Sequence, residues 1–330
     1  MNKTGGSHEI ILAVPNLQNP SPPADGYRGR FAPSPTGPLH AGSLVAALGS
    51  WLDARQNQGK WLLRIEDLDT PRRILGADQE IMRQLQSCGL FWDGEPTWQS
   101  KRLERYKEAL ERLNRLQIVY PCTCTRQSIA GALEAQGLIT PRNQEMVYPG
   151  SCRPQEIPSY QGENILLTQV ALRLGLPPDL TIDFEDLALG KQSQDLNREV
   201  GDFVLRRRDN VFTYQLAVVV DDAEQEINHI VRGADLLNNT ARQIHLQSIL
   251  GYETPSYLHL PVVLDEFGEK LSKQTLASAI KTENTQEALQ ELRKAAKHLG
   301  LRDLPDGKAT SIAEWLLAAT QAWDRKIISS

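Results

Sequence analysis

The sequence contains no apolar run that approaches the roughly 20 residues of a membrane-spanning helix. The short apolar segment at residues 10–14 is also too short to be the core of a signal peptide. Only four of the 330 residues are cysteine. We therefore expect a cytoplasmic protein without a membrane partner, in which the cysteines are thiols or metal ligands rather than disulfides.

The sequence also lacks an excess of positive charge and a serine-hydrolase motif. Its formal net charge is −5, so no overall basic field indicates nucleic acid, although RNA-binding enzymes can use local basic patches. No Gly-x-Ser-x-Gly sequence occurs, which argues against a Ser-His-Asp hydrolase. Hydrophobic residues make up 40%, enough for a sizeable core, and the length suggests roughly two domains. The Gly- and Pro-rich residues 1–27 are predicted to be a disordered N-terminal extension.

One stretch combines a strand end, a tight loop and a helix start. It reads Arg30-Phe31-Ala32-Pro33-Ser34-Pro35-Thr36-Gly37-Pro38-Leu39-His40-Ala41-Gly42. The prolines and glycine exclude both helix and strand ladder, and helical periodicity follows from Leu44 onward. The unpaired N–H groups at such a helix start favour anions, phosphate above all, and His40 can add a donor. Because such turns occur in every α/β protein, this stretch alone leaves nucleotide binding and a purely structural turn both open.

Two further polar stretches follow apolar runs. A predicted strand over residues 60–65 leads into a loop that holds Glu66, Asp67 and Asp69. Ligand contacts of α/β sheets lie at such strand ends, but a solvated acidic turn is an equally valid interpretation. Far downstream, an apolar run precedes Lys270-Leu271-Ser272-Lys273-Gln274. Two lysines three residues apart in a polar loop suit the charge of a triphosphate.

Three of the four cysteines lie near one another in the chain, at Cys122, Cys124 and Cys152. Zinc prefers four ligands, and the nearest candidate for the fourth is Tyr148, an uncommon zinc ligand. Three buried, inert thiols remain the alternative. Cys88, alone on a predicted helix, is expected to be a core residue.

Two other side chains and one helix have open interpretations. Arg232 ends a short predicted strand; since an uncompensated buried charge costs ~3–5 kcal/mol, it either reaches water or holds an anion. Tyr214 belongs to the core or to a site, and the apolar run that follows it is a strand or a buried helix. The basic face of a predicted helix around residues 102–115 either contacts RNA or is a solvated amphipathic face.

Over residues 28–280, these motifs resemble the glutamyl branch of the class I aminoacyl-tRNA synthetases. The His40-x-Gly42 turn and the stretch from Lys270 resemble the two ATP signatures of that class, and the segment around Glu66 resembles its glutamate-binding segment. Within the branch, the sequence is similar to the glutamyl-Q tRNA(Asp) synthetases, in which a C-x-C and Y-x3-C site binds zinc. The spacer at residues 125–147 is longer than that family pattern.

The resemblance implies roles for individual residues. The implied sets are His40, Lys270 and Lys273 for catalysis; His40, Gly42 and Lys273 for ATP; Arg30, Phe31, Ala32, Pro33, Ser34, Glu66, Tyr214 and Arg232 for glutamate; and Cys122, Cys124, Tyr148 and Cys152 for one Zn²⁺. Glu66 would hold the α-ammonium group and the two arginines the two carboxylates, a charge set that rejects glutamine. Lys273 and the Mg²⁺ that accompanies ATP would neutralise the charge that grows on the α-phosphate.

The resemblance also implies an α/β fold, with a Rossmann-like class I catalytic domain, a small zinc-containing connecting insertion and a C-terminal helical region. The expected boundaries are 28–119 and 201–275 for the two catalytic halves, 120–200 for the zinc-binding insertion and 276–330 for the helical region. Only 57 residues follow Lys273, whereas an anticodon-binding region needs ~100 or more.

The resulting expectation is tRNA-independent activation of L-glutamate by ATP, followed by transfer of glutamate to the queuosine base of tRNA(Asp). The expected partners are queuosine-containing tRNA(Asp), L-glutamate and ATP; no stable protein partner is implied, so we expect a monomer. Three alternatives stay open: a truncated enzyme that charges the tRNA 3′ end, a non-catalytic glutamate- or tRNA-binding paralogue, and a small nucleotidyltransferase.

Overall fold

The structure is a computed structural model that describes residues 26–138, 145–158, 169–264, 278–305, 307 and 310–325. Its elements, in chain order, are β1 (Arg28–Phe31), α1 (Ala41–Gln56), β2 (Lys60–Ile65), α2 (Ala77–Ser87), β3 (Thr97–Trp98), α3 (Leu103–Arg115), β4 (Val119–Cys122), α4 (Arg126–Ala135), β5 (Ala171–Leu174), β6 (Thr181–Asp186), β7 (Gly190–Asp195), α5 (Leu196–Glu199), β8 (Phe203–Arg206), α6 (Tyr214–Glu224), β9 (His229–Gly233), α7 (Thr240–Leu250), β10 (Ser256–Leu260), α8 (Thr285–His298) and α9 (Ile312–Ala322). Short 3₁₀ turns lie at Thr70–Arg72, Gln99–Lys101 and Ala234–Asn239. The expected α/β class is confirmed.

The strands that position the site run in parallel. β1, β2 and β3 form one parallel set, and β9 pairs in parallel with β10. The N–H of Asn228 donates to the carbonyl of Arg28 (3.1 Å), which joins the starts of β9 and β1. The carboxyl ends of β1, β2, β9 and β10 therefore lie along one edge, where ligands of α/β sheets bind.

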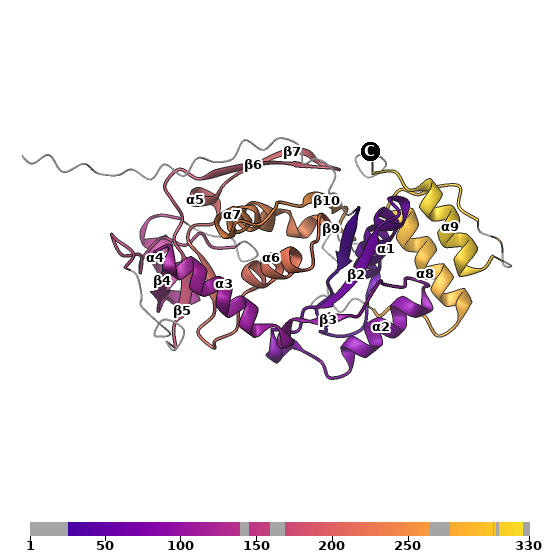
Figure 1. The fold of residues 1–330 in the computed structure, drawn as a ribbon, viewed down its shortest axis with the longest axis horizontal. Coiled ribbons are helices and arrows are strands. Elements are labelled where there is room, and N and C mark those ends of the chain that lie inside the picture. Colours follow the sequence, from indigo (N-terminus) through magenta and orange to yellow (C-terminus); the bar gives the residue numbers. More distant parts are fainter. Residues whose placement is uncertain are drawn as a thin grey trace, which may run out of the picture.

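Helix α1 is covered by the last two helices of the chain. Helices α8 and α9 lie against it on one side (Figure 1). Its apolar residues, which include Leu44, Leu48 and Leu52, are buried in one core together with residues of β1, β2, α8 and α9. At Gly49, an added Cβ would lie 2.6 Å from the Leu260 side chain, so the glycine allows α1 to approach β10 closely. In the described part of the chain, no helix has both the length and the apolarity to cross a membrane.

The apolar run after Tyr214 is a helix, which resolves the ambiguity that the sequence left. A second core surrounds this helix, α6, which is buried from Gln215 to Asp222 and packs against α3 and α7. β8 precedes this helix in the chain, and Asn210, with φ of 64°, turns the chain between them. Because the middle of the helix is buried on all sides, residues 216–220 are all apolar.

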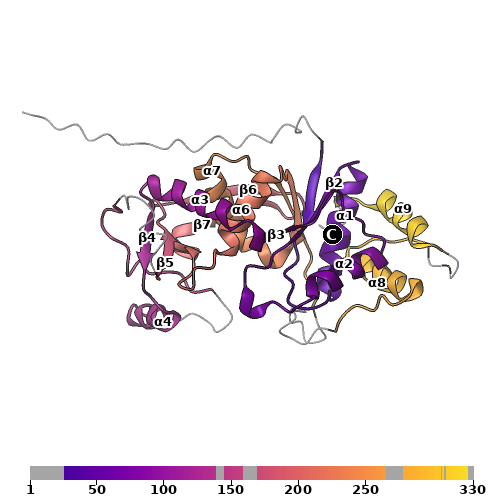
Figure 2. The same ribbon diagram turned by 60° about the horizontal axis from the view of Figure 1, so that its bottom comes forward.

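The segment that the sequence assigned to an insertion contributes to two sheets. β4, β5 and β8 form a separate antiparallel sheet at the end of the molecule that also carries α4, opposite α8 and α9 (Figure 2). The hairpin of β6 and β7, in contrast, extends the sheet of β10 and β9, since Asp186 of β6 pairs with Tyr257 of β10. This brings the end of β6 beside Tyr257, two residues before His259 in β10.

Candidate active site

The loops that follow β1 and β2 enclose a small pocket. The N–H of Glu66 donates to the carbonyl of Pro33 (3.0 Å), and the N–H of Ile74 donates to that of Pro35 (3.0 Å). The pocket, of about 140 Å³, is lined by Ser34, Pro35, Thr36, Glu66, Asp67, Asp69, Arg72 and Arg73. The structure thus brings together Ser34 and Glu66, which the sequence analysis assigned to one ligand.

Arg30 is paired with a carboxylate that the sequence analysis did not identify as its partner. Its Nε lies 3.1 Å from Oδ1 of Asp222, and its Nη2 lies 3.4 Å from Oδ2. Arg64 contacts the same carboxylate at 2.8 Å, and all three side chains are buried. The charge of Arg30 is therefore largely compensated within the protein. The only hint of this partner in the sequence was the pair Asp221-Asp222, which ends the apolar run of α6.

Glu66 is a largely buried carboxylate, with its side chain 10% exposed, and has an incomplete set of partners. Its Oε1 lies 3.6 Å from Nη2 of Arg64, too far for a hydrogen bond. Burial is the largest influence and raises the pKa of Glu66 to about 7, against the lowering effect of Arg64 and Arg30. An ammonium group beside Glu66 would favour the ionised form and lower this pKa. The site is thus suited to a cation.

Arg232 is buried and, unlike Arg30, has only neutral partners. They are the Tyr214 hydroxyl (3.2 Å), Gln243 Oε1 (2.8 Å), Thr240 Oγ1 (2.9 Å), the Leu236 carbonyl (3.4 Å) and His259 Nε2 (3.1 Å). Among the described residues, no carboxylate lies within ion-pair distance of Arg232. Its side chain is only 4% exposed, so the alternative that it reaches water is wrong. An anionic ligand would supply the missing countercharge.

His40 caps the N-terminus of α1. Its Nδ1 accepts the N–H of Ser43 (3.4 Å), so in the neutral ring the proton lies on Nε2 and makes that atom a donor. Gly42 is the second residue of the helix, where backbone N–H groups are unpaired.

The segment that follows the stretch Lys270–Gln274 lies against the start of α1. His40 forms an antiparallel bridge with Ala279, and the N–H of Ile280 donates to the carbonyl of Leu39 (2.9 Å). Lys270 and Lys273 themselves lie outside the described residues.

Gln84 on α2 fastens these two segments and was missed by the sequence analysis. Its Oε1 accepts the N–H of Leu39 (2.7 Å), and its Nε2 donates to the carbonyl of Ile280 (3.4 Å). The side chain is buried. The only sequence signal was a polar residue on the apolar face of a predicted helix.

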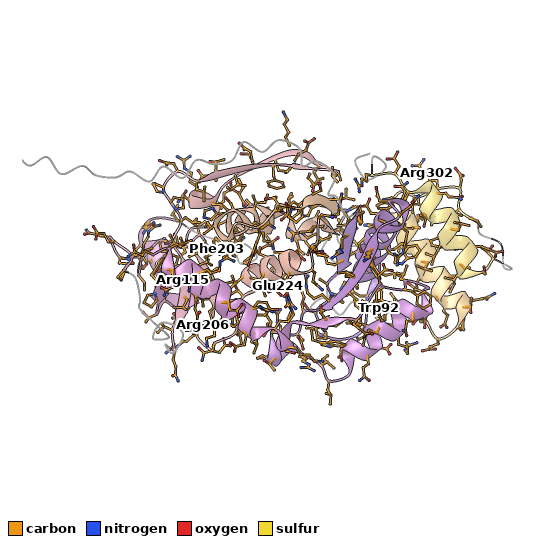
Figure 3. The ribbon with its side chains drawn as sticks, viewed as in Figure 1. Trp92, Arg115, Phe203, Arg206, Glu224 and Arg302 are labelled. Atoms are coloured by element: carbon orange, nitrogen blue, oxygen red, sulfur yellow. The ribbon has the colours of Figure 1, made fainter. Side chains whose placement is uncertain are left out.

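Side-chain contacts bear on two further interpretations from the sequence, those of Phe31 and of the basic helix. Phe31 packs in the core, stacked on Trp61 with ring centroids 6.1 Å apart, so only its backbone can face a ligand. At the N-cap of the basic helix α3, Arg102 pairs with Asp221 (2.6 Å) and with Glu224 (2.6 Å; Glu224 is labelled in Figure 3). This arginine therefore serves packing between α3 and α6, which favours the amphipathic interpretation of the helix over an RNA-binding one.

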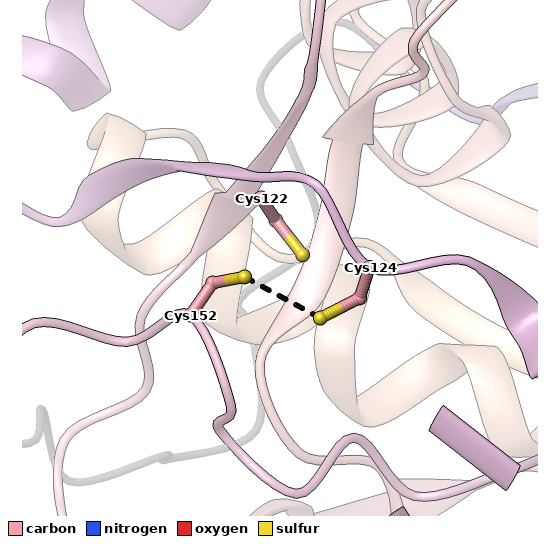
Figure 4. Close-up of side chains that lie close together, drawn as sticks. All are labelled: Cys122, Cys124 and Cys152. Carbon is pink, nitrogen blue, oxygen red and sulfur yellow. Dashed lines mark hydrogen bonds between the residues drawn. The ribbon is translucent and has the colours of Figure 1, made fainter. Parts of the chain in front are cut away.

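The three cysteines form a compact cluster (Figure 4), and the Tyr148 hydroxyl lies against it. The sulfurs of Cys122, Cys124 and Cys152 all lie within 4.8 Å of one another, and those of Cys124 and Cys152 are 3.3 Å apart. The Tyr148 hydroxyl lies 3.4 Å from the Cys122 sulfur and 3.6 Å from that of Cys124. In a tetrahedral site with Zn–S bonds of ~2.3 Å, sulfurs lie roughly 3.8 Å apart, so this donor set fits zinc.

Neighbouring residues hold the cluster in this shape. Gly201 has φ of 71°, and a Cβ there would lie 2.5 Å from the carbonyl oxygen of Tyr148. The guanidinium of Arg173 stacks on the Tyr148 ring at 3.7 Å and donates to the Cys122 sulfur (3.3 Å). Burial opposes ionisation of Cys152, but hydrogen bonds from Thr123 and its other neighbours lower its pKa to about 6. The thiolate form is the one that binds metals.

Comparison with known proteins agrees with this geometry. Residues 27–315 match the family of class I tRNA synthetases (E and Q), catalytic domain. The chain is 51% identical over 299 residues to a glutamyl-Q tRNA(Asp) synthetase of Cupriavidus metallidurans, covering 90% of this chain and 91% of that protein. It is 52% identical over 303 residues to the enzyme of the same name from Burkholderia cenocepacia, covering 91% and 97%.

A solved structure is similar along most of the chain. It is a glutamate tRNA ligase from Elizabethkingia meningosepticum in complex with its amino acid, with 28% identity and a TM-score of 0.73. The match covers 92% of this chain but 65% of the other, so this chain spans less than two thirds of that ligase.

Proposed function

The chain belongs to the class I tRNA synthetases for glutamate and glutamine, within the glutamyl-Q tRNA(Asp) synthetases, and from this premise we propose that it activates L-glutamate with ATP to glutamyl-adenylate without tRNA. It then transfers the glutamate to the queuosine base in the anticodon loop of tRNA(Asp). The protein is thus an ATP-dependent ligase whose substrates are L-glutamate, ATP and queuosine-containing tRNA(Asp).

The observation that carries the proposal is the buried Arg232, whose hydrogen-bond partners are all neutral. A glutamate carboxylate would supply its countercharge. Glu66, with a pKa near 7, binds the α-ammonium group and ionises as it does so. Arg30, Tyr214 and the loop from Phe31 to Ser34 complete the glutamate site. Glutamine would leave a buried guanidinium without a countercharge, so the site rejects it.

Activation needs no nucleophile from the protein. A glutamate carboxylate oxygen attacks the α-phosphorus of ATP in line, a P–O bond to the α-phosphorus forms, and pyrophosphate leaves. His40 Nε2 and the N–H groups at the start of α1, near Gly42, bind phosphate oxygens. Lys273, with Lys270 as a second cation, neutralises the charge that develops, together with the Mg²⁺ bound to ATP.

We propose one structural zinc ion, held by Cys122, Cys124, Tyr148 and Cys152. The fit of the donor distances supports this set. Four protein ligands would leave no open position for a substrate, so the ion would fasten β4 to the chain around Tyr148 and would not take part in the chemistry.

We also propose the domain boundaries 28–119, 120–200, 201–275 and 276–330, with 1–27 as an extension, and a cytoplasmic monomer. The packing of α8 and α9 on α1 supports a helical region that stabilises the first catalytic half.

The function is tested in two steps. Purified protein with L-glutamate, ATP and Mg²⁺ but no tRNA should exchange pyrophosphate into ATP. Labelled glutamate should then be found, after nuclease mapping, on the queuosine nucleotide, and tRNA that lacks queuosine serves as the control. Label on the 3′-terminal adenosine would instead identify a tRNA-charging enzyme, and absence of exchange would indicate a non-catalytic paralogue.

A further inference from the structure

A buried carboxylate, an imidazole and a guanidinium form a line across three neighbouring strands. Asp186 ends β6, His259 lies on β10, and Arg232 lies opposite His259 on β9. Oδ2 of Asp186 is 2.6 Å from Nδ1 of His259, and Nε2 of His259 is 3.1 Å from Nε of Arg232. All three residues are at most 4% exposed.

The hydrogen-bonding roles in this line follow from the arginine. A guanidinium can only donate, so Nε2 of His259 must be the acceptor, and the ring proton must lie on Nδ1, where it is donated to Asp186. Asp186 is fixed in turn, because its Oδ1 accepts the N–H groups of Ala188 (3.0 Å) and Leu189 (2.9 Å). The carboxylate therefore selects one tautomer of His259, and this tautomer orients Arg232.

The ionisation of the pair agrees with these roles. Burial raises the pKa of Asp186, but hydrogen bonds from His259 and the two backbone N–H groups outweigh it and keep the pKa below its usual value. Burial is the main cause that lowers the pKa of His259, so the ring is neutral and able to accept.

The ring also separates two opposite charges. Arg30 touches Asp222 directly and is compensated by it, whereas the imidazole keeps the carboxylate of Asp186 out of contact with Arg232. Arg232 is therefore oriented by an acid without being paired to it, so its charge stays available to an anion.

We propose that His259, with its tautomer selected by Asp186, is a positioning residue that orients the guanidinium of Arg232 toward the carboxylate of the substrate glutamate. The inference rests on the proposed glutamate-activating function and adds Asp186 of β6 and His259 of β10 to its specificity. Both residues would act through Arg232 rather than by contact with the substrate.

The Asp186→Asn variant tests the proposal with almost no change in volume. Oδ1 of the new amide stays with the backbone N–H groups of Ala188 and Leu189, so the NH₂ group faces His259. The ring then carries its proton on Nε2 and directs a donor at the Nε–H of Arg232. We expect the KM for glutamate in pyrophosphate exchange to rise about 10- to 100-fold, the loss typical of a hydrogen bond to a charged group. The kcat at saturating glutamate and the KM for ATP should change less than about twofold. The reason is that the lost contact stabilises bound glutamate equally in the ground state and in the transition state.

Variants of His259 provide rescue. His259→Leu should raise the KM for glutamate at least as much as Asp186→Asn does. His259→Gln should keep this KM close to the wild-type value, because its amide can accept from Arg232 and donate to Asp186. Tyr257→Phe, on the same strand as His259, is the matched control: it removes a buried hydrogen bond donated by Gln247 of α7 and should leave both KM values unchanged.

The proposal is overturned if the KM of Asp186→Asn for glutamate stays within twofold of the wild-type value. It is also overturned if the KM values for glutamate and ATP rise equally, or if only kcat falls. If Asp186→Asn melts below the assay temperature, equal glutamate KM values for His259→Gln and His259→Leu overturn it. A wild-type protein without glutamate-dependent exchange would instead refute the proposed function; glutamate binding to the same variants, measured by calorimetry, would then decide the inference.

Discussion

The Glu66→Gln substitution should raise stability and impair function at the same time. The pKa of Glu66 is raised from 4.5 to about 7 in the folded protein. One pKa unit corresponds to 1.36 kcal/mol, so the difference amounts to about 3 kcal/mol. Because the folded pKa is the higher one, this stability is present below pH 4.5 and is lost as the pH rises through 7. A glutamine, which never ionises, avoids the loss.

The stability effect is measured by thermal melts at two pH values. At pH 8, we expect Glu66→Gln to melt several degrees above the wild type, since about 1 kcal/mol corresponds to roughly 2–4 °C in a chain of this size class. At pH 4.5, the two melting temperatures should nearly coincide. Glu95→Gln, a change at an exposed carboxylate, should show no difference at either pH.

The functional effect has the opposite sign. Loss of the contact between carboxylate and ammonium removes about 1.5–3 kcal/mol of the free energy of glutamate binding. The KM for glutamate should therefore rise about 10- to 100-fold, and the KM for ATP should stay unchanged. In the wild type, glutamate affinity should fall below about pH 7, where Glu66 takes up a proton; in the variant this dependence should disappear. A variant that is less stable at pH 8, or that loses ATP and glutamate binding together, would refute the assignment.

Three further substitutions test other parts of the architecture. Gly201→Ala should displace Tyr148 and lower the zinc content below one per chain by metal analysis, whereas Gly190→Ala, with φ of 70° but no atom within 4 Å, should retain the metal; equal zinc in both would contradict the proposed site. Asp222→Asn removes the carboxylate that pairs with the buried Arg30, whereas Arg64 keeps Asp221 (3.7 Å) and Glu66 (3.6 Å) nearby. It should cost about 3–5 kcal/mol in the free energy of unfolding, measured by denaturant titration; a loss below 1 kcal/mol would speak against the network. Gln84→Leu should raise the KM for ATP more than the KM for glutamate, and the reverse order would argue against its role at the start of α1.

The sequence by itself determined the order of elements and the residue types of the site. The strand, loop and helix around His40 and the strand before Glu66 follow from periodicity and from proline and glycine positions, which are local signals. The resemblance to the glutamyl branch is also local, because each motif is a short run whose chemistry depends on neighbours in the chain.

The tertiary structure alone decided which charges meet. Arg30 and Asp222 are 192 residues apart in the chain, and no periodicity links them. The difference between a compensated Arg30 and an uncompensated Arg232 arises only when α6 and β9 pack beside β1. The same holds for Asp186, which reaches Arg232 through His259 because β6 pairs with β10. Coulomb and hydrogen-bond energies depend on distances of a few ångströms between side chains, and these distances are fixed by packing rather than by position along the chain.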